Sequence, residues 1–240
     1  MTMKDNTTIW LFGRGLSCNC GLTWTVPDEW KTLPREQHIK QIKTAIRCEM
    51  NKPTVNTSCI RRLLDDLATQ TPPGHQHHFG TTNWDYLLQR EMPATEKGDI
   101  DCPEWLVDSH VSHLNGTTEE LTSNQNRSPF LLQEDVSSER KWTVEANKFY
   151  VAMTNNRRFV VAGMSFECET DKFLMQALGK VKDDLPIGDS TWLVINNNSV
   201  DLTKACIAIS TSLPHSNVIP VQSGFSEWQD DEYPYLWGMS

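Results

Sequence analysis

The sequence predicts an α/β fold, in which one parallel sheet carries helices on both faces. Apolar runs with strand character alternate along the chain with segments whose apolar residues recur at helical spacing. Strands that alternate with helices form parallel sheets with both faces covered. The turn Gly13-Arg14-Gly15 directly follows the first apolar run, which is typical of a Rossmann-like nucleotide-binding domain. Both observations favour the same fold class.

The length and charge of the chain limit its organisation and its partners. A chain of 240 residues can bury a sizeable core without disulfides or metals. We expect one domain over 1–240, with a small helical lobe at about 24–75 and an acidic, aromatic C-terminal tail at 228–240. The tail is expected to pack back on the domain, with docking to a partner as the alternative. The net charge of -9 argues against nucleic acid as a partner.

The cysteines and the N-terminus indicate a compartment. Seven cysteines without paired spacing favour reduced thiols in a cytoplasm. The first apolar run, Ile9–Phe12, is too short for a signal-peptide core or a membrane span. We therefore expect a cytoplasmic protein with no membrane association.

Proline, glycine and helix-capping residues indicate where the expected elements of the first half begin and end. Pro34 favours the first turn of a helix, and Thr57 or Ser58 is suited to cap the next one. The Thr-Pro-Pro-Gly segment at 71–74 ends that second helix. The expected elements are a strand at 8–12, a helix at 34–50, a helix from about 58 to 70, a strand at 77–82 and a helix at 84–90.

The second half continues the alternation. We expect an extended segment at 105–113, a loop at 115–128, helices at 141–153, 171–181 and about 202–210, and strands at 158–164, 191–196 and 217–221. Four polar or glycine residues fall where predicted strands end: Gly13, Asn83, Gly163 and Asn196. The carboxyl ends of parallel strands meet at one edge of a sheet, and ligands bind there.

Five short motifs occur in a fixed order along the chain. They are Gly13 to Leu22, Thr82-Asn83-Trp84-Asp85, His113-Leu114-Asn115-Gly116, Gly163-Met164-Ser165 and Ile195-Asn196. Together they resemble the glycine loop, the Gln-Asn-Ile-Asp, His-x-x-Gly, Gly-x-Ser and Ile-Asn motifs of the sirtuin-like NAD-binding family. The resemblance runs from about residue 8 to 221. Arg14 is its sharpest departure, because the family has alanine there.

The resemblance implies a Rossmann-like domain with NAD or ADP-ribose as its ligand. The phosphates would be held by the glycine loop, through Gly13, Arg14, Gly15 and Ser17. The pyrophosphate or adenosine side of the ligand would be held by Gly163 and Ser165, and Asn196 would contact a ribose. The catalytic residues would be Asn83, Asp85 and His113, around the nicotinamide ribose. Arg14 either pairs with a phosphate or obstructs the loop.

The residue types suit cleavage of the nicotinamide–ribose bond. Nicotinamide leaves a pyridinium cation as a neutral group, so the transition state is oxocarbenium-like and needs little acid assistance. The Asn83 amide can donate to and accept from a water or a ribose hydroxyl. The imidazole of His113 titrates near neutrality and can accept a proton. Asp85 would be a supporting polar residue.

Two departures separate the chain from protein-deacylating sirtuins. Those enzymes hold a structural zinc with two Cys-x-x-Cys pairs, and this sequence has none, so we expect no zinc ribbon and no metal. Their Pro-Asp-Phe-Arg segment is also missing, and Pro27-Asp28 appears only a few residues late. The resemblance is therefore to the zinc-free branch, which includes NAD glycohydrolases of bacterial antiphage defence. Water would be the nucleophile there.

Several alternatives stay open at this point. Asn83 could cap a helix that begins at Trp84, and His113 could be an ordinary strand-end histidine. The run His75-x-His77-His78 lacks a carboxylate or cysteine to complete a metal site. The chain could also bind NAD or ADP-ribose as a non-catalytic sensor, or transfer ADP-ribose to a protein. Enzymes of the resembled branch are commonly inactive until assembled, which implies a homo-oligomer or an activating protein partner.

Overall fold

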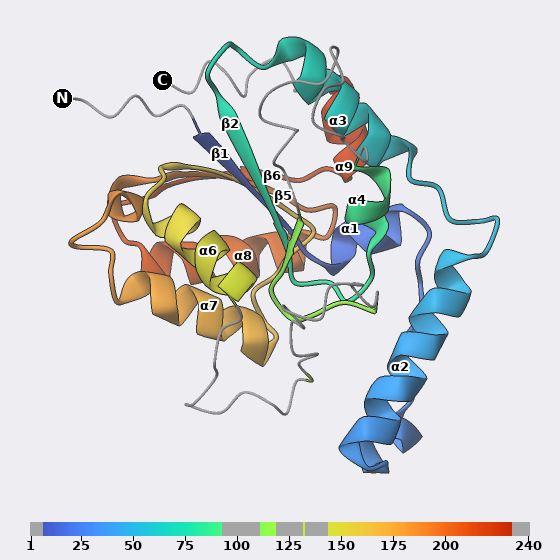
Figure 1. Cartoon of the computed structure of the whole chain (residues 1–240). Helices are drawn as coiled ribbons and strands as arrows, with labels where there is room; N and C mark the ends of the chain where they lie inside the picture. Colours follow the sequence, from blue (N-terminus) through green and yellow to red (C-terminus); the bar gives the residue numbers. More distant parts are fainter. Residues whose placement is uncertain (1–6, 93–110, 119–131, 133–143, 232–240) are drawn as a thin grey trace.

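A six-stranded, entirely parallel sheet forms the centre of the molecule. The computed structural model describes residues 7–92, 111–118, 132 and 144–231 (Figure 1). The strands are β1 (Thr7–Phe12), β2 (Gln76–Thr81), β3 (Val111–His113), β4 (Arg158–Ala162), β5 (Thr191–Ile195) and β6 (Asn217–Val221). Their order is β3-β2-β1-β4-β5-β6, and each neighbouring pair is parallel. This is the strand order of the Rossmann fold, so the predicted fold class is confirmed at that level.

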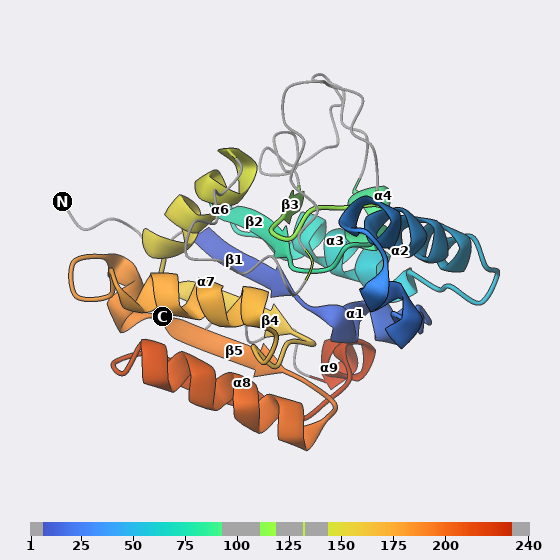
Figure 2. The same ribbon diagram turned by 90° about the horizontal axis from the view of Figure 1, so that it is seen from below.

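Helices cover both faces of the sheet, as predicted. The helices are α1 (Arg14–Asn19), α2 (Arg35–Met50), α3 (Ser58–Gln70), α4 (Leu87–Glu91), α6 (Val144–Thr154), α7 (Glu169–Gly179), α8 (Ser199–Ser212) and α9 (Phe225–Asp231), with 3-10 turns η1 (Asp28–Thr32) and η3 (Pro186–Asp189). Residues of α6, α7 and α8 form the core on one face, and residues of α1, α3, α4 and α9 form it on the other. In Figure 2, α7 and α8 run along β4 and β5, whereas α9 lies beside α1. No described helix is both long and apolar enough to cross a membrane.

The central strand β1 shows why an unbroken apolar run forms here. Trp10 and Phe12 point into the core beneath α1 and α3, whereas Ile9 and Leu11 point toward α6 and α7. All four side chains are fully buried. Successive side chains of a strand alternate between faces, so a strand covered on both sides requires apolar residues at every position.

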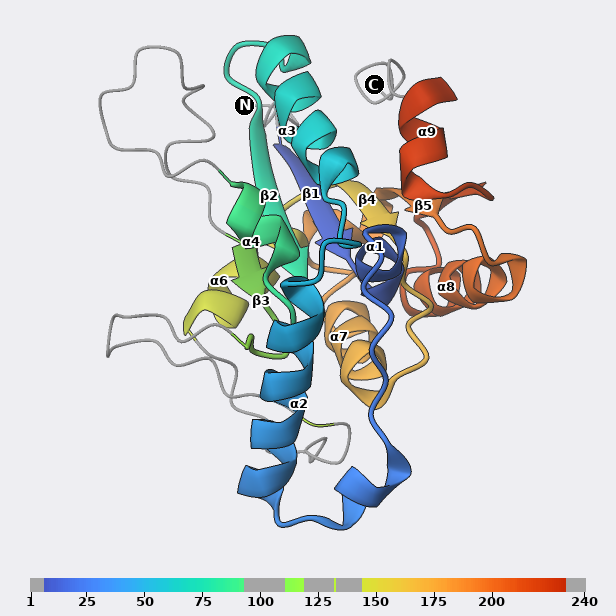
Figure 3. The same ribbon diagram turned by 90° about the vertical axis from the view of Figure 1, so that its right-hand side faces the viewer.

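Within the predicted lobe at 24–75, the helices differ in their relation to the sheet. The helix α2 extends away from the sheet (Figure 3), whereas α3 packs on it. The buried side chains of α2 recur every four residues at His38, Ile42, Ile46 and Met50. Ile39, one residue after His38, is only half-buried.

The start of α4 differs from the sequence prediction for a specific reason. A helix was expected from Trp84, but α4 begins at Leu87. The Asp85 Oδ1 accepts a hydrogen bond from the Leu87 backbone N–H at 3.2 Å, which closes a turn of this side chain onto the backbone two residues further on. The residues from Asn83 to Asp85 are thereby kept in a loop at the end of β2.

Three further predictions lie partly outside the described residues. Of the extended segment at 105–113, only Val111–His113 is described, as β3. Of the loop at 115–128, residues 115–118 are described, and all four are buried. Of the tail at 228–240, Trp228 lies buried in α9, and 232–240 are outside the described residues.

Two buried histidines at the start of β2 are held by hydrogen bonds. His75 Nε2 lies 2.9 Å from the Thr8 hydroxyl. The Trp10 indole N–H donates to His77 Nδ1 at 3.0 Å, and His77 Nε2 lies 3.0 Å from the Thr71 hydroxyl. Burial, followed by the charges of His75 and His78, lowers the pKa of His77 to about 2. His77 is therefore neutral in the folded protein at all ordinary pH values.

We expect the protein to lose stability in acid because of this histidine. An unfolded histidine gains a proton below about pH 6.5, whereas folded His77 does not, so its contribution is present above that pH and is lost as pH falls toward the folded pKa. The free energy of unfolding that is lost through His77 should reach about 3 kcal/mol by about pH 4. Urea unfolding across this range should show a shallower pH dependence for His77→Gln than for wild type. His78→Gln is the control, because His78 is the exposed neighbour of His77. An equal pH dependence of the free energy of unfolding for wild type, His77→Gln and His78→Gln would contradict this assignment.

Candidate functional site

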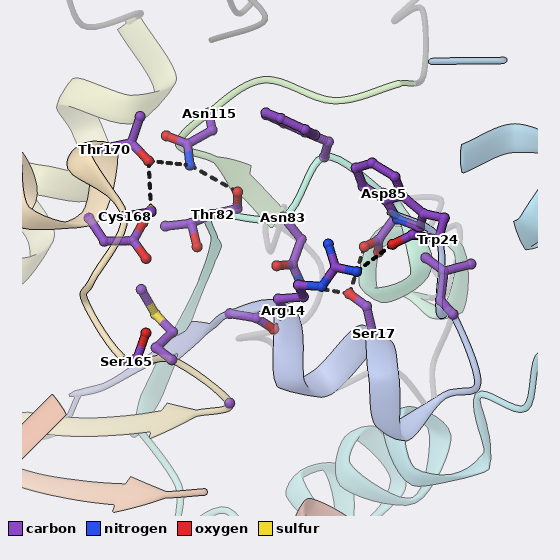
Figure 4. Close-up of a pocket in the computed structure, with 16 residues that line it drawn as sticks. Arg14, Ser17, Trp24, Thr82, Asn83, Asp85, Asn115, Ser165, Cys168 and Thr170 are labelled. Carbon is purple, nitrogen blue, oxygen red and sulfur yellow. Dashed lines mark hydrogen bonds between the residues drawn. The ribbon is translucent and has the colours of Figure 1, made fainter. Parts of the chain in front are cut away.

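A cavity lies at the carboxyl ends of β1 and β4, where the strand order reverses. Its volume is about 250 Å³, and ligands of parallel α/β sheets bind at this position. The lining comes from the segments after β1, β2, β3 and β4 (Figure 4) and comprises Gly13, Arg14, Ser17, Leu22, Trp24, Thr82, Asn83, Trp84, Asp85, Asn115, Gly163, Met164, Ser165, Cys168, Thr170 and Asp171. Of the predicted site residues, Gly13, Arg14, Ser17, Asn83, Asp85, Gly163 and Ser165 come together here.

Glycines bring the turns after β1 and β4 into backbone contact. The Gly13 N–H donates to the Ala162 carbonyl and the Gly15 N–H to the Gly163 carbonyl, both at 2.9 Å. Gly163 has φ +67°, and a Cβ placed on it would lie 2.5 Å from the Cα of Gly15. Only glycine fits such an approach without strain. Because Gly163 already accepts the Gly15 N–H, that donor is not available to a phosphate in this arrangement.

Backbone strain is found beside the same turn. Phe166 is buried and has φ +55°, a conformation that costs a bulky residue about 1–2 kcal/mol. The residue before it, Ser165, lines the cavity and accepts a hydrogen bond from the Glu167 N–H at 3.4 Å. Strained residues held by their surroundings cluster at functional sites, so the turn from Gly163 to Phe166 supports a functional role for the cavity.

Asn83, Ser17 and Asp85 form one hydrogen-bonded chain at the cavity. The Ser17 hydroxyl donates to Asp85 Oδ2 at 2.6 Å. The Asn83 Nδ2 donates to the Ser17 Oγ at 2.8 Å and to the Gly13 carbonyl at 2.9 Å. Both hydrogens of the amide are used in these bonds, so Oδ1 is the atom that Asn83 can offer to a ligand. The side chain of Asn83 does not cap α4, which begins at Leu87 with Tyr86 as its N-cap residue.

The Asp85 carboxyl is almost fully enclosed. Its side chain is 6% exposed, and burial raises its pKa, while the hydrogen bonds from Ser17 and Leu87 and the positive charge of Arg14 act in the opposite direction. A buried carboxylate that keeps its charge needs such donors. Asp85 therefore links the position of Ser17 to the start of α4.

Arg14 and two tryptophans lie together at the edge of the cavity. The Arg14 Nη2 donates to the Trp24 carbonyl, and its guanidinium carbon lies 5.2 Å from the centre of the Trp24 ring. The Trp24 and Trp84 rings are 5.8 Å apart. Figure 4 shows Arg14 between Asn83 and Trp24. Aromatic faces beside a cation provide a surface for a flat, charged ring.

At the opposite end of the cavity, Asn115 joins the segment after β2 to the start of α7. Its Nδ2 donates to the Thr82 carbonyl at 2.9 Å and to the Thr170 hydroxyl at 3.2 Å. The Cys168 sulfur lies 3.1 Å from the same hydroxyl. Burial raises the pKa of the Cys168 thiol to about 11, so this thiol is protonated and is a poor nucleophile.

The structure does not bring His113 into the cavity lining. His113 is absent from the lining and is 4% exposed. Its Nε2 lies 3.0 Å from Gln89 Oε1, and because that oxygen only accepts, Nε2 carries the hydrogen in this arrangement. Among the described residues, the buried Nδ1 makes no hydrogen bond of good geometry, although a backbone group of Asn83 lies close enough to raise the pKa of the ring. Burial lowers the pKa of His113 to about 4, so the imidazole is neutral near pH 7.

Asn196 lies in a second, smaller cavity that shares Gly163 with the first. This cavity measures about 20 Å³ and is also lined by Gly15, Ser223 and Phe225, which is room for about one water molecule. The Asn196 Nδ2 donates to the Met164 carbonyl at 3.2 Å. The predicted site residues therefore divide between two neighbouring cavities, with His113 outside both.

Several lining residues were not predicted. Thr82, Trp84 and Asn115 lay inside the motifs, and their places after strand ends could have identified them. Thr170 and Asp171 follow the Gly163–Ser165 turn at the start of α7, which was a weaker signal. Trp24 gave none, because its place depends on the path of the loop between α1 and η1. In the described part of the chain, no three histidine, cysteine or acidic side chains lie together as a metal site.

The chain matches no model of a known protein family and no curated protein. A function is therefore inferred from the motifs and from the geometry of the two cavities.

Proposed function

We propose that the chain is an NAD glycohydrolase with the sirtuin-like NAD-binding fold, of the zinc-free branch that serves bacterial antiphage defence. The observation that carries this proposal is the chain of hydrogen bonds from Asn83 through Ser17 to Asp85, beside the cavity where the strand order reverses. Four of the five motifs contribute residues to that one cavity.

The two cavities suit the two halves of a dinucleotide. The larger one, about 250 Å³, is just below the range of about 300–1,000 Å³ common for whole ligands, which suits a nicotinamide ribose. The diphosphate would cross at Gly163, and the adenosine would lie toward Asn196. Because that second cavity is only about 20 Å³, the segment from Ser223 to Phe225 must move when the adenosine binds.

The chemistry assigned to the larger cavity is dissociative. The nicotinamide ring would stack against Trp24 or Trp84 and leave as a neutral molecule, while the developing positive charge on the ribose faces the carboxyls of Asp85 and Asp171. The Asn83 Oδ1 would accept a hydrogen from the attacking water or from a ribose hydroxyl, which holds it at attack distance. Such a site works by position more than by proton transfer.

His113 has a different place in this proposal from the one its motif suggested. A neutral imidazole can accept a proton, but a substrate reaches this ring only if the Thr82–Asn83 segment moves. A backbone group of Asn83 is the neighbour that favours its protonated form. We therefore assign His113 to hold Asn83 in place from behind, with the role of general base as the alternative.

Product analysis of NAD labelled in its adenylate half separates the candidate functions. Hydrolysis gives equal amounts of nicotinamide and free ADP-ribose, whereas transfer leaves the label on protein. Binding without release supports the sensor, for which Arg14 in the glycine loop is the favouring observation. The assay should cover a concentration series, because the resembled enzymes act as oligomers or with an activating partner. Absence of both binding and release at every concentration would contradict the proposal.

We expect Arg14→Ala to weaken the binding of ADP-ribose. Its guanidinium is exposed and lies next to the glycine loop, so it can turn from the Trp24 carbonyl to the diphosphate. Hydrogen bonds to charged groups contribute about 1.5–3 kcal/mol, which corresponds to a loss of about 10- to 100-fold in affinity. Calorimetric titration measures the affinity for ADP-ribose. Arg157→Ala is the control, because Arg157 is exposed before the start of β4, at the end of the sheet away from the cavity. Tighter binding would mean that Arg14 obstructs the loop, and unchanged binding would mean that Arg14 does not pair with the diphosphate.

A further inference from the structure

Two buried thiols meet where α1, α3 and α9 come together. The sulfurs of Cys20 and Cys59 lie 3.7 Å apart. The segments that carry them are tied by the Asn56 N–H, which donates to the Cys20 carbonyl at 2.9 Å. A disulfide requires an S–S distance of about 2.0 Å, so the two sulfurs must approach each other by about 1.7 Å to be joined.

The surroundings assign different roles to the two thiols. Cys59 is the second residue of α3, where the helix dipole favours a negative charge. The Asn19 Nδ2 donates to its sulfur at 3.4 Å and to the Ser226 hydroxyl at 2.9 Å. The hydrogen bond from Cys20, aided by Asn19 and Ser226, lowers the pKa of Cys59. The hydrogen bond with Cys59 and burial raise the pKa of Cys20.

We propose that Cys20 and Cys59 form a peroxide-sensitive dithiol that closes to an intramolecular disulfide. The Cys59 thiolate attacks one oxygen of hydrogen peroxide, the S–O bond forms, the O–O bond breaks, and hydroxide leaves as water after taking a proton. The Cys20 sulfur then attacks the sulfur of the Cys59 sulfenic acid, the S–S bond forms, the S–O bond breaks, and the hydroxyl group leaves as water with the Cys20 proton. Two thiols lose two electrons in total, and peroxide is reduced to two waters.

Exposure sets the order of the two steps. Cys59 is 4% exposed and Cys20 is fully buried, so an oxidant from solvent meets Cys59 first. Cys18 and Cys48 are exposed, but no second sulfur lies within hydrogen-bonding reach of either in the part of the chain that the structure describes. These two thiols can be oxidised, but they have no neighbour with which to close a bond.

The disulfide would join the end of α1 to the start of α3. Because α1 begins in the glycine loop and carries Ser17, the bond would fix the rear of the cavity wall. The two cysteines are 39 positions apart, and closing a loop of that length should raise Tm by roughly 5–15 °C. The dithiol is independent of the proposed NAD chemistry.

Peptide mapping after treatment with a small excess of hydrogen peroxide tests the proposal in the full chain. Wild type and Cys48→Ser should both yield a Cys20–Cys59 linked peptide that dithiothreitol removes, together with the rise in Tm. Cys20→Ser should stop at a sulfenic acid on Cys59, trapped by dimedone. A wild type that is oxidised at Cys18 or Cys48 without the Cys20–Cys59 link would overturn the proposal, as would dimedone on Cys20 in Cys59→Ser. The wild-type map is decisive even if a serine variant fails to fold.

Discussion

Gly163→Ala is expected to lower the free energy of unfolding by about 3–5 kcal/mol. The new Cβ would lie 2.5 Å from the Cα of Gly15 and 2.7 Å from its carbonyl carbon, and the backbone at Gly163 has φ +67°. Part of the cost is the left-handed conformation, and the larger part is the separation of the turns after β1 and β4. In a chain of this length, such a loss should lower Tm by roughly 10 °C or more.

Gly74→Ala is the matched control for Gly163→Ala. Gly74 has φ +79°, but a Cβ placed on it would meet nothing within 4 Å, so this variant carries the conformational cost alone, about 1–2 kcal/mol. Urea and thermal unfolding of both variants therefore separate backbone strain from steric contact. Equal destabilisation of the two would show that the contact between Gly15 and Gly163 does not hold the turns together.

Asn83→Ala should reduce the kcat of nicotinamide release about 10²- to 10³-fold, as expected when a fixed polar group of a catalytic site is removed. The change deletes the Oδ1 acceptor and also frees Ser17 and the Gly13 carbonyl from their hydrogen bonds with Nδ2. The affinity for NAD should change much less, because the proposed binding mode places the phosphates and the adenosine away from this side chain. Initial rates of nicotinamide release, with calorimetric binding in parallel, measure the two effects.

Asn155→Ala is the control for Asn83→Ala. The Asn155 Nδ2 also donates to a backbone carbonyl, that of Val151 at 2.8 Å, but the residue is exposed at the end of α6, outside both cavities. Its loss should leave turnover unchanged. If Asn83→Ala kept turnover within about threefold of wild type, a difference worth less than about 0.7 kcal/mol, Asn83 would not position the nucleophile.

The sheet could be predicted from the sequence because each strand carries its own local signal. The strand β6 was predicted at its observed bounds, and β1 within one residue. Gly13, Asn83, Gly163 and Asn196 were predicted at strand ends, and the structure places each after a strand. Helix boundaries were less well predicted. The start of α4, for example, depends on the turn that the Asp85 side chain forms with the Leu87 N–H.

The geometry of the site could be predicted only in part. The order of motifs placed Asn83, Ser17 and Asp85 in one region, but the hydrogen bonds among them join residues up to 68 positions apart and depend on the packing of α1 against the loop after β2. The direction of the His113 ring is another tertiary property, because it depends on Gln89. Trp24 enters the cavity by the path of a loop that has no periodic pattern.

A crystal structure of the chain with an NAD analogue whose nicotinamide–ribose bond resists cleavage would locate the ligand directly. We predict the nicotinamide ribose within hydrogen-bonding distance of Asn83 Oδ1, the diphosphate beside Gly13 and Gly163, and the adenosine next to Asn196 with Phe225 displaced. An analogue bound at any other place, or no bound analogue at saturating concentration, would contradict the assignment of this cavity to NAD.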